Sequence, residues 1–387
     1  MSMEAMISVI AIKHQKKHFG SLLRWLVLPI CIMYCLSLRV HAANTAEKLI
    51  LGNWKCTEVI PNKLHNINKD GFTFYKDSIC DYMPGYVSKE TSADAWNDHK
   101  KFLGTKTKYR LLGNQLGIFN KSKNDWQSFR IKSISEKKMA LVSDEGIEYV
   151  FSRIKNIKVE DVSYDQIILS ASGCFGSCPS NMISVKESGE VVYCGIKYNS
   201  KNGLYSARVD KKNFKEIKNT FSRTPVSTLK EEYIMPVKDT EEITVTFIKD
   251  GKIVKTIRDN YRLVPHEFYW AYSSLRYLYQ NLKTDTISSR FSLYPFTSML
   301  IESTNKRFLL RGSEAFYLWL MLMNKPETNQ SFMEVYQIQN MGKDEIKTMT
   351  SDGRFFKIVD RDGRSKTYDL GYDFFTQNQL LSKFFPR

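Results

Sequence analysis

Cys174-Phe175-Gly176-Ser177-Cys178-Pro179 is the stretch that says most about the fold of this 387-residue chain. It follows the strand-like run Gln166–Ser170 and precedes a hairpin pattern formed by Met182–Lys186 and Val191–Tyr193. Two cysteines four positions apart predict a disulfide that clips the loop, because Gly176 relaxes the backbone between them. The spacing argues against thiol–disulfide exchange, since redox motifs place two residues between their cysteines at the start of a helix.

Residues 160–285 contain two copies of one pattern, a hairpin followed by a helix. Helix-like segments at Lys211–Phe221 and Pro265–Leu282 close the two copies. Apolar residues of the second segment recur at spacings that give one face to pack on a sheet: Phe268, Tyr272, Leu275 and Tyr279. The pattern therefore predicts an α+β domain around the cysteine loop.

The cysteine loop also carries a family resemblance. Its residues match the signature Cys-Phe-Gly-x-Cys-Pro through Cys174, Phe175, Gly176, Cys178 and Pro179. With the hairpin and the helix at Pro265, residues 160–285 resemble the bacterial domain-of-unknown-function family 6438. The resemblance implies the fold and an exported location, and it assigns no catalytic residue.

Residues 43–156 predict a closed antiparallel β-barrel or a β-sandwich, because short alternating runs recur there between turn signals, and we expect the barrel. The entry Gly52-Asn53-Trp54 resembles the Gly-x-Trp start of lipocalins and of lipocalin-like envelope domains, in which the tryptophan closes one end of the barrel. That resemblance implies a small apolar ligand, whereas eight strands also suit a barrel filled by its own side chains. The polar stretch Ser88–Lys100 departs from the meander and predicts a helix or a lid.

Residues 286–387 predict a helix followed by a β-meander. The apolar run Ser313–Met323 favours the helix, and strands are expected near Glu345–Thr350, Phe355–Val359 and Lys366–Leu370. The predicted fold class is therefore β-rich α+β: an N-terminal lipocalin-like antiparallel barrel, an α+β domain of hairpin–helix units, and a C-terminal α+β extension.

Residues 1–42 are typical of an export signal. A basic leader precedes the apolar run Trp25–Leu38, and Val40-His41-Ala42 suits cleavage before Ala43. We expect a periplasmic or secreted protein that begins near Ala43. An uncleaved anchor through residues 25–38 is the alternative, although this run is shorter than the roughly 20 residues of a membrane span.

Five cysteines follow the export signal, and an oxidising compartment favours disulfides among them. We expect a Cys56–Cys80 disulfide within the barrel, with two buried thiols as the alternative. Cys194 is then the odd thiol. A two-residue turn at Ser188-Gly189 would place it opposite Ile183, on the apolar face of the hairpin, and we expect it to be buried there.

The chain is strongly basic, with 57 Lys and Arg against 41 Asp and Glu and a formal net charge of +16. The positive residues are spread along the chain and balanced locally by acids, which indicates a solvated surface. Attraction to an anionic envelope surface is the alternative. Nucleic acid is not expected as a partner, because no recognition motif accompanies the charge.

The sequence predicts no catalytic, cofactor-binding or metal site. No nucleophile elbow surrounds Ser172-Gly173-Cys174, and the histidines outside the signal are too few for a metal-ligand set: His65, His99 and His266. We expect a non-enzymatic envelope or secreted protein that binds a small apolar ligand in the barrel or a protein partner. The alternatives are an envelope hydrolase acting on wall or lipid material and an immunity or inhibitor protein that binds a toxin.

Overall fold

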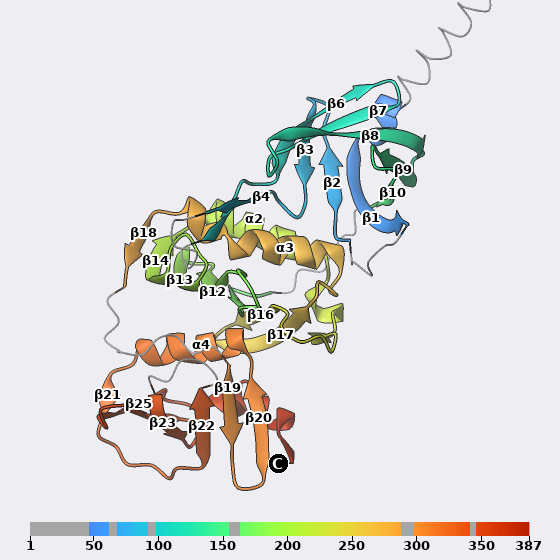
Figure 1. Cartoon of the computed structure of the whole chain (residues 1–387). Helices are drawn as coiled ribbons and strands as arrows, with labels where there is room; N and C mark the ends of the chain where they lie inside the picture. Colours follow the sequence, from blue (N-terminus) through green and yellow to red (C-terminus); the bar gives the residue numbers. More distant parts are fainter. Residues whose placement is uncertain are drawn as a thin grey trace, which may run out of the picture.

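The computed structural model describes residues 46–61, 68–91, 98–154, 163–287, 298–340 and 346–386. Three large sheets follow one another along the chain, and the first closes into a barrel (Figure 1). The β-rich α+β fold with an N-terminal antiparallel barrel is thereby confirmed. The predicted export signal, residues 1–42, and its cleavage site before Ala43 lie outside the described residues. No described helix is long and apolar enough to cross a membrane.

The barrel is an up-and-down meander in the closed order β1-β10-β9-β8-β7-β6-β3-β2. Its strands are β1 (Gly52–Ile60), β2 (Gly71–Phe74), β3 (Ile79–Tyr82), β6 (Lys106–Leu112), β7 (Gln115–Asn120), β8 (Asp125–Ile134), β9 (Lys138–Ser143) and β10 (Glu148–Arg153). Between β3 and β6, β4 (Val87–Glu90) and β5 (His99–Phe102) form a separate two-stranded sheet. The stretch Ser88–Lys100, expected as a helix or a lid, begins and ends in these strands, and its residues 92–97 lie outside the described part.

The middle sheet has eight strands in the order β15-β17-β16-β11-β12-β13-β14-β18. They are β11 (Gln166–Ala171), β12 (Ser180–Lys186), β13 (Glu190–Lys197), β14 (Gly203–Arg208), β15 (Glu232–Tyr233), β16 (Glu242–Lys249), β17 (Lys252–Asn260) and β18 (Thr284–Thr286). Its helical segments are α2 (Lys211–Phe221), η2 (Val226–Thr228), α3 (His266–Arg276) and η3 (Leu278–Asn281). The predicted helix Pro265–Leu282 is thus two segments, and Pro265 caps the first of them.

The C-terminal sheet has the order β21-β25-β24-β23-β22-β19-β20-β26. Its strands are β19 (Met299–Glu302), β20 (Lys306–Leu310), β21 (Glu327–Thr328), β22 (Tyr336–Asn340), β23 (Ile346–Ser351), β24 (Phe355–Asp360), β25 (Ser365–Asp369) and β26 (Phe385–Pro386). Its helices are α4 (Gly312–Met323), α5 (Phe374–Gln377) and η4 (Leu380–Lys383). The predicted helix of this region is present as α4, and the three predicted strands are present as β23, β24 and β25.

Helices cover both faces of the middle sheet. On one face, Ile183 and Val185 belong to an apolar cluster with residues of α2 and α3. On the other, Met182 and Cys194 belong to a cluster with residues of α4 and the C-terminal sheet. Figure 1 shows α3 and α4 on opposite sides of the sheet. A strand covered in this way is apolar at consecutive positions, as strand β11 is.

The predicted hairpin register around Cys194 is wrong by one residue. Cys194 pairs with Met182, not with Ile183. The loop between β12 and β13 has three residues instead of two, and Gly189 takes its left-handed position with a φ of 86°. A one-residue shift turns a side chain to the other face of the sheet. Cys194 is buried nonetheless, because α4 covers that second face.

The predicted Cys56–Cys80 disulfide is also wrong, since both side chains are buried free thiols. Strand β2 lies between them: Cys80 pairs with Phe74, and Phe74 pairs with Gly52. The two cysteines are therefore roughly 10 Å apart across the strands and offset by roughly 13 Å along them. A disulfide requires Cα atoms within about 7 Å. Burial raises the pKa of each thiol to about 12, which makes both unreactive.

Candidate ligand site

One end of the barrel is closed by a tryptophan and an arginine. Trp54 is fully buried and donates its indole N–H to the carbonyl of Ile50, at 2.7 Å. The guanidinium of Arg153 lies 4.1 Å from the centre of the Trp54 ring and donates to the carbonyl of Leu51 at 2.5 Å. A Cβ on Gly52 would lie 2.6 Å from Arg153 Nη1, so this close approach favours glycine. The motif residues Gly52 and Trp54 thus form the closed end.

The opposite end of the barrel faces helix α3. Near the start of the helix, the indole N–H of Trp270 donates to the carbonyl of Lys69, at 2.6 Å. Beyond its end, the Gln280 amide accepts from Phe102 N and donates to the carbonyl of Lys100, both at 2.8 Å. The helix and η3 therefore run from Lys69, just before β2, to strand β5. Figure 1 shows α3 below the barrel strands.

A cavity of ≈610 Å³ lies between the barrel mouth and α3. The barrel contributes its apolar wall through Phe72, Phe129, Leu141 and Phe151. Tyrosines enter from both sides, namely Tyr82, Tyr86, Tyr149, Tyr269, Tyr272 and Tyr277. A second hollow of ≈720 Å³ shares lining residues with the first: Asp70, Lys100, Tyr149, Glu241, Arg262 and Tyr272. Each volume falls in the range of sites for small molecules, about 300–1,000 Å³.

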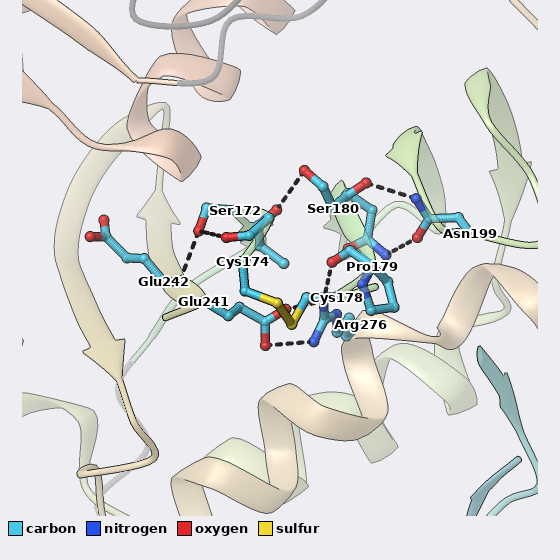
Figure 2. Close-up of polar contacts among 12 residues, drawn as sticks. Ser172, Cys174, Cys178, Pro179, Ser180, Asn199, Glu241, Glu242 and Arg276 are labelled. Atoms are coloured by element: carbon cyan, nitrogen blue, oxygen red, sulfur yellow. Dashed lines mark hydrogen bonds and ion pairs between the residues drawn. A yellow bond between two sulfur atoms is a disulfide. The ribbon is translucent and has the colours of Figure 1, made fainter. Parts of the chain in front are cut away.

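The cysteine loop lies at the rim of the second hollow. Cys174 and Cys178 form the predicted disulfide, with their Cα atoms 5.5 Å apart, and both line the hollow. Figure 2 shows the contacts that hold the loop. Arg276 of α3, which is buried, donates to the carbonyl of Pro179 and to both carboxylate oxygens of Glu241. The loop is therefore fixed to α3, while Phe175 at its tip is 89% exposed.

Two carboxylates that line the hollows, those of Asp70 and Asp259, accept hydrogen bonds from tyrosine hydroxyls. Asp70 accepts from the Tyr82 hydroxyl at 2.6 Å. Asp259 accepts from the Tyr272 hydroxyl at 2.6 Å and from Leu263 N at 2.7 Å. Burial raises the pKa of Asp259, although these donors oppose the shift. Asp259 thus fixes Tyr272 and the chain before α3, and neither of its oxygens is left without a donor.

A strained turn between β17 and α3 places Arg262 in the cavity. Tyr261 and Arg262 both have a positive φ, 68° and 61°, which costs roughly 1–3 kcal/mol for each non-glycine residue. Two side chains hold the turn: Asp259 accepts from Leu263 N, and Asn260 bonds both backbone groups of Met235, at 2.7 and 2.9 Å. Strain held by such contacts is a feature of functional sites.

A family model matches the middle of the chain. Residues 165–279 match the model of a domain of unknown function (DUF6438). The DUF6438 region thus falls within residues 160–285, and it includes the cysteine loop, Arg262 and α3. No curated protein matches the chain. A crystal structure of an uncharacterized protein from Bacteroides eggerthii DSM 20697 has 15% identity and a TM-score of 0.19, over 27% of this chain and 98% of that one.

The acidic side chains of the two hollows lie apart from one another or are paired with donors. Within the described ranges there is no group of three or more His, Cys, Asp or Glu side chains that could hold a metal ion. The buried carboxylate of Asp259 is held by two donors, and the Glu241 carboxylate is paired with Arg276. What the cavity offers a small molecule is an apolar wall, tyrosine hydroxyls and positive charge.

Sequence reasoning missed most of these residues. The sequence pattern places Tyr272 only on the apolar face of the predicted helix Pro265–Leu282, and Lys100 only at the end of a polar stretch. Arg262, Tyr269 and Asp70 carried no local signal, because the DUF6438 region and the barrel contribute them from distant parts of the chain. Consecutive left-handed residues are not visible in a sequence unless they are glycine or asparagine.

Proposed function

We propose that this chain is an exported, non-enzymatic binding protein that holds a small molecule with an apolar part at the junction of the barrel and the DUF6438 region. The observation that carries the proposal is the cavity of ≈610 Å³, which has an apolar wall inside the barrel and a polar wall on α3. Such a site buries an apolar body and orients it by a few polar groups.

The barrel itself is proposed to be lipocalin-like. Three features support this: eight antiparallel strands in simple meander order, the Gly52–Trp54 entry strand, and the closure of one end by Arg153 over Trp54. The interior near that end is filled by the barrel's own side chains, among them Tyr109, Leu116 and Met139. The ligand would therefore enter only the mouth, where Leu141 and Phe151 line the cavity.

Binding is tested with an uncharged apolar dye, N-phenyl-naphthylamine, whose fluorescence rises in apolar surroundings. We expect saturable binding by the native chain. The substitution Leu141→Trp fills the apolar wall and should weaken binding by about tenfold or more, which is about 1.4 kcal/mol. Leu112→Trp, at a position 72% exposed on β6, is the control and should bind as the native chain does.

Two results would reject the proposed site. One is no saturable binding by the native chain, and the other is equal binding by Leu141→Trp when its circular dichroism and unfolding midpoint show a folded protein. The second measurement is needed because overpacking a core position costs about 1–3 kcal/mol of stability.

Export is the part of the proposal that rests on residues 1–42. The apolar run Trp25–Leu38 and the small residues before Ala43 support it, and the Cys174–Cys178 disulfide is compatible with an oxidising compartment. N-terminal sequencing of envelope material should give a chain that starts at or near Ala43. A chain that starts within the first ten residues would show that the signal is not removed.

A further inference from the structure

Two cations in the cavity have no acidic partner among the described residues. Arg262 and Lys100 line both hollows, and no carboxylate oxygen of a described residue lies within 4.0 Å of either cation. The Arg262 guanidinium lies over the ring of Tyr269, 5.6 Å from the ring centre. Lys100 is partly buried, and its backbone carbonyl is fixed by Gln280. Because no described acid of the two hollows forms an ion pair with them, these two cations are available to an anionic ligand.

Four acids line the hollows beside these two cations, namely Asp70, Asp239, Glu241 and Asp259, and among the described residues none of them forms an ion pair with either cation. Asp70 is bonded to Tyr82 and to the Asn68 side chain, at 2.6 and 3.0 Å. Glu241 forms its ion pair with Arg276, and Asp259 is held by Tyr272 and Leu263. An anion that bound Arg262 and Lys100 would therefore not have to break an existing ion pair.

The lowered pKa of Lys100 also indicates positive charge in this part of the cavity. Burial lowers its pKa, and the positive charges of Arg276 and Arg262 lower it further, while Glu241 opposes them. Lys100, Arg262 and Arg276 thus place three positive charges close together at the cavity. A bound oxyanion would reduce the repulsion among them and would replace the water that Lys100 has lost.

We infer that Arg262 and Lys100 bind the oxyanion head group of an amphipathic acid, a carboxylate or a phosphate, whose apolar part lies against Leu141 and Phe151. This assignment rests on the proposed function, and it specifies the class of ligand. The guanidinium fork suits two oxygens of one head group, and the ammonium of Lys100 supplies a further donor. The strained turn at Tyr261 and Arg262 fixes one of these groups before the ligand arrives.

The test compares three compounds that share one chain: dodecanoate, dodecyl phosphate and dodecanol. Each is used below its micellar concentration to displace the dye N-phenyl-naphthylamine. We expect at least one of the acids to bind about 10- to 100-fold more tightly than the neutral alcohol, the effect of a charge-assisted hydrogen bond. The acid that binds more tightly tells a carboxylate from a phosphate ligand.

Substitutions locate the effect. Arg262→Gln and Lys100→Gln should each reduce the preference for the acid, measured in each variant as the ratio of the dissociation constant of dodecanol to that of the acid. Arg262→Lys keeps the charge and should retain part of the preference. Lys101→Gln is the matched control, because the neighbouring Lys101 side chain is 60% exposed, and it should retain all of the preference.

Each contrary outcome has a distinct meaning. Equal binding of the acids and the alcohol by the native chain overturns the head-group assignment, and so does an acid preference that survives in both glutamine variants. In either case dye binding still supports the proposed function. Absence of binding by the dye and by all three compounds overturns the proposed function and the assignment with it.

Discussion

Arg153 is the residue on which closure of the barrel depends most. Its guanidinium lies over Trp54 and donates to the carbonyls of Leu49, Leu51 and Glu136. Arg153→Met keeps the apolar stem and loses these bonds, so we expect it to lower the free energy of unfolding by about 2–4 kcal/mol. Arg130→Met, at an exposed position on β8, should change it by no more than about 0.5 kcal/mol. Urea unfolding of both variants measures this, and equal losses would contradict the role of Arg153.

We expect His266 to make the stability of the chain depend on pH. Burial lowers its pKa below 6.5, and the nearby charge of Lys69 lowers it further, while Glu267 opposes them. The unfolded chain then binds more protons than the folded chain as pH falls below about 6.5. Acidification should therefore lower the free energy of unfolding, and each unit of pKa separation accounts for at most about 1.4 kcal/mol.

Urea unfolding at about pH 7.5 and about pH 5.5 measures this dependence. His266→Gln should reduce the difference between the two conditions, because glutamine does not titrate. A variant with the same difference as the native chain would show that other groups cause the acid sensitivity.

At the scale of the element, the β12–β13 loop sets the register of the hairpin. Gly189 has a φ of 86°, and a Cβ there would collide with the carbonyl oxygen of Val209. Gly251 has a similar φ of 73°, but the nearest atom to its Cβ would be the Tyr317 hydroxyl, at 3.9 Å. Gly251→Ala should cost about 1 kcal/mol from backbone strain alone, and Gly189→Ala about 1–3 kcal/mol more. Thermal unfolding compares them, and equal losses would contradict the close approach to Val209.

Local patterns predicted the elements better than their partners. The helix near Ser313–Met323 follows from its apolar run, and the strands β23, β24 and β25 follow from the turns between them. The register of β12 and β13 did not follow, because Ser188-Gly189 suits both a two-residue loop and the end of a three-residue loop. The Cys56–Cys80 pairing failed because strand order, not distance along the chain, separates the two cysteines.

At the scale of the whole molecule, α4 joins the middle and C-terminal sheets. Phe316 of α4 and Cys194 of β13 belong to one apolar cluster, and the Ser313 hydroxyl lies 2.7 Å from that of Thr246 in β16. Phe316→Ala should cost about 3–5 kcal/mol and loosen both sheets together. Maleimide labelling of Cys194 should then accelerate about a hundredfold or more.

Peptide mapping by mass spectrometry follows each thiol separately in that experiment. Cys56 belongs to the barrel cluster, so its labelling serves as the internal reference and should change little. Faster unfolding of the C-terminal sheet with unchanged labelling of Cys194 would show that the two sheets unfold independently.

The candidate site lay beyond sequence reasoning because it exists only between parts of the chain. The sequence indicated a barrel that could hold a ligand and a helix with an apolar face. It did not indicate that α3 and η3 run from Lys69 to strand β5, since the contacts of Trp270 with Lys69 and of Gln280 with Lys100 join positions about 200 residues apart. The cations Arg262 and Lys100 became neighbours through these contacts.

Native mass spectrometry of the chain isolated from its own envelope fraction tests the central claim most directly. We predict a bound small molecule of defined mass on the native chain and on Leu112→Trp, and its loss from Leu141→Trp, which remains folded. A native chain that carries no small molecule, or an equal load on Leu141→Trp, would contradict a ligand site at the mouth of the barrel.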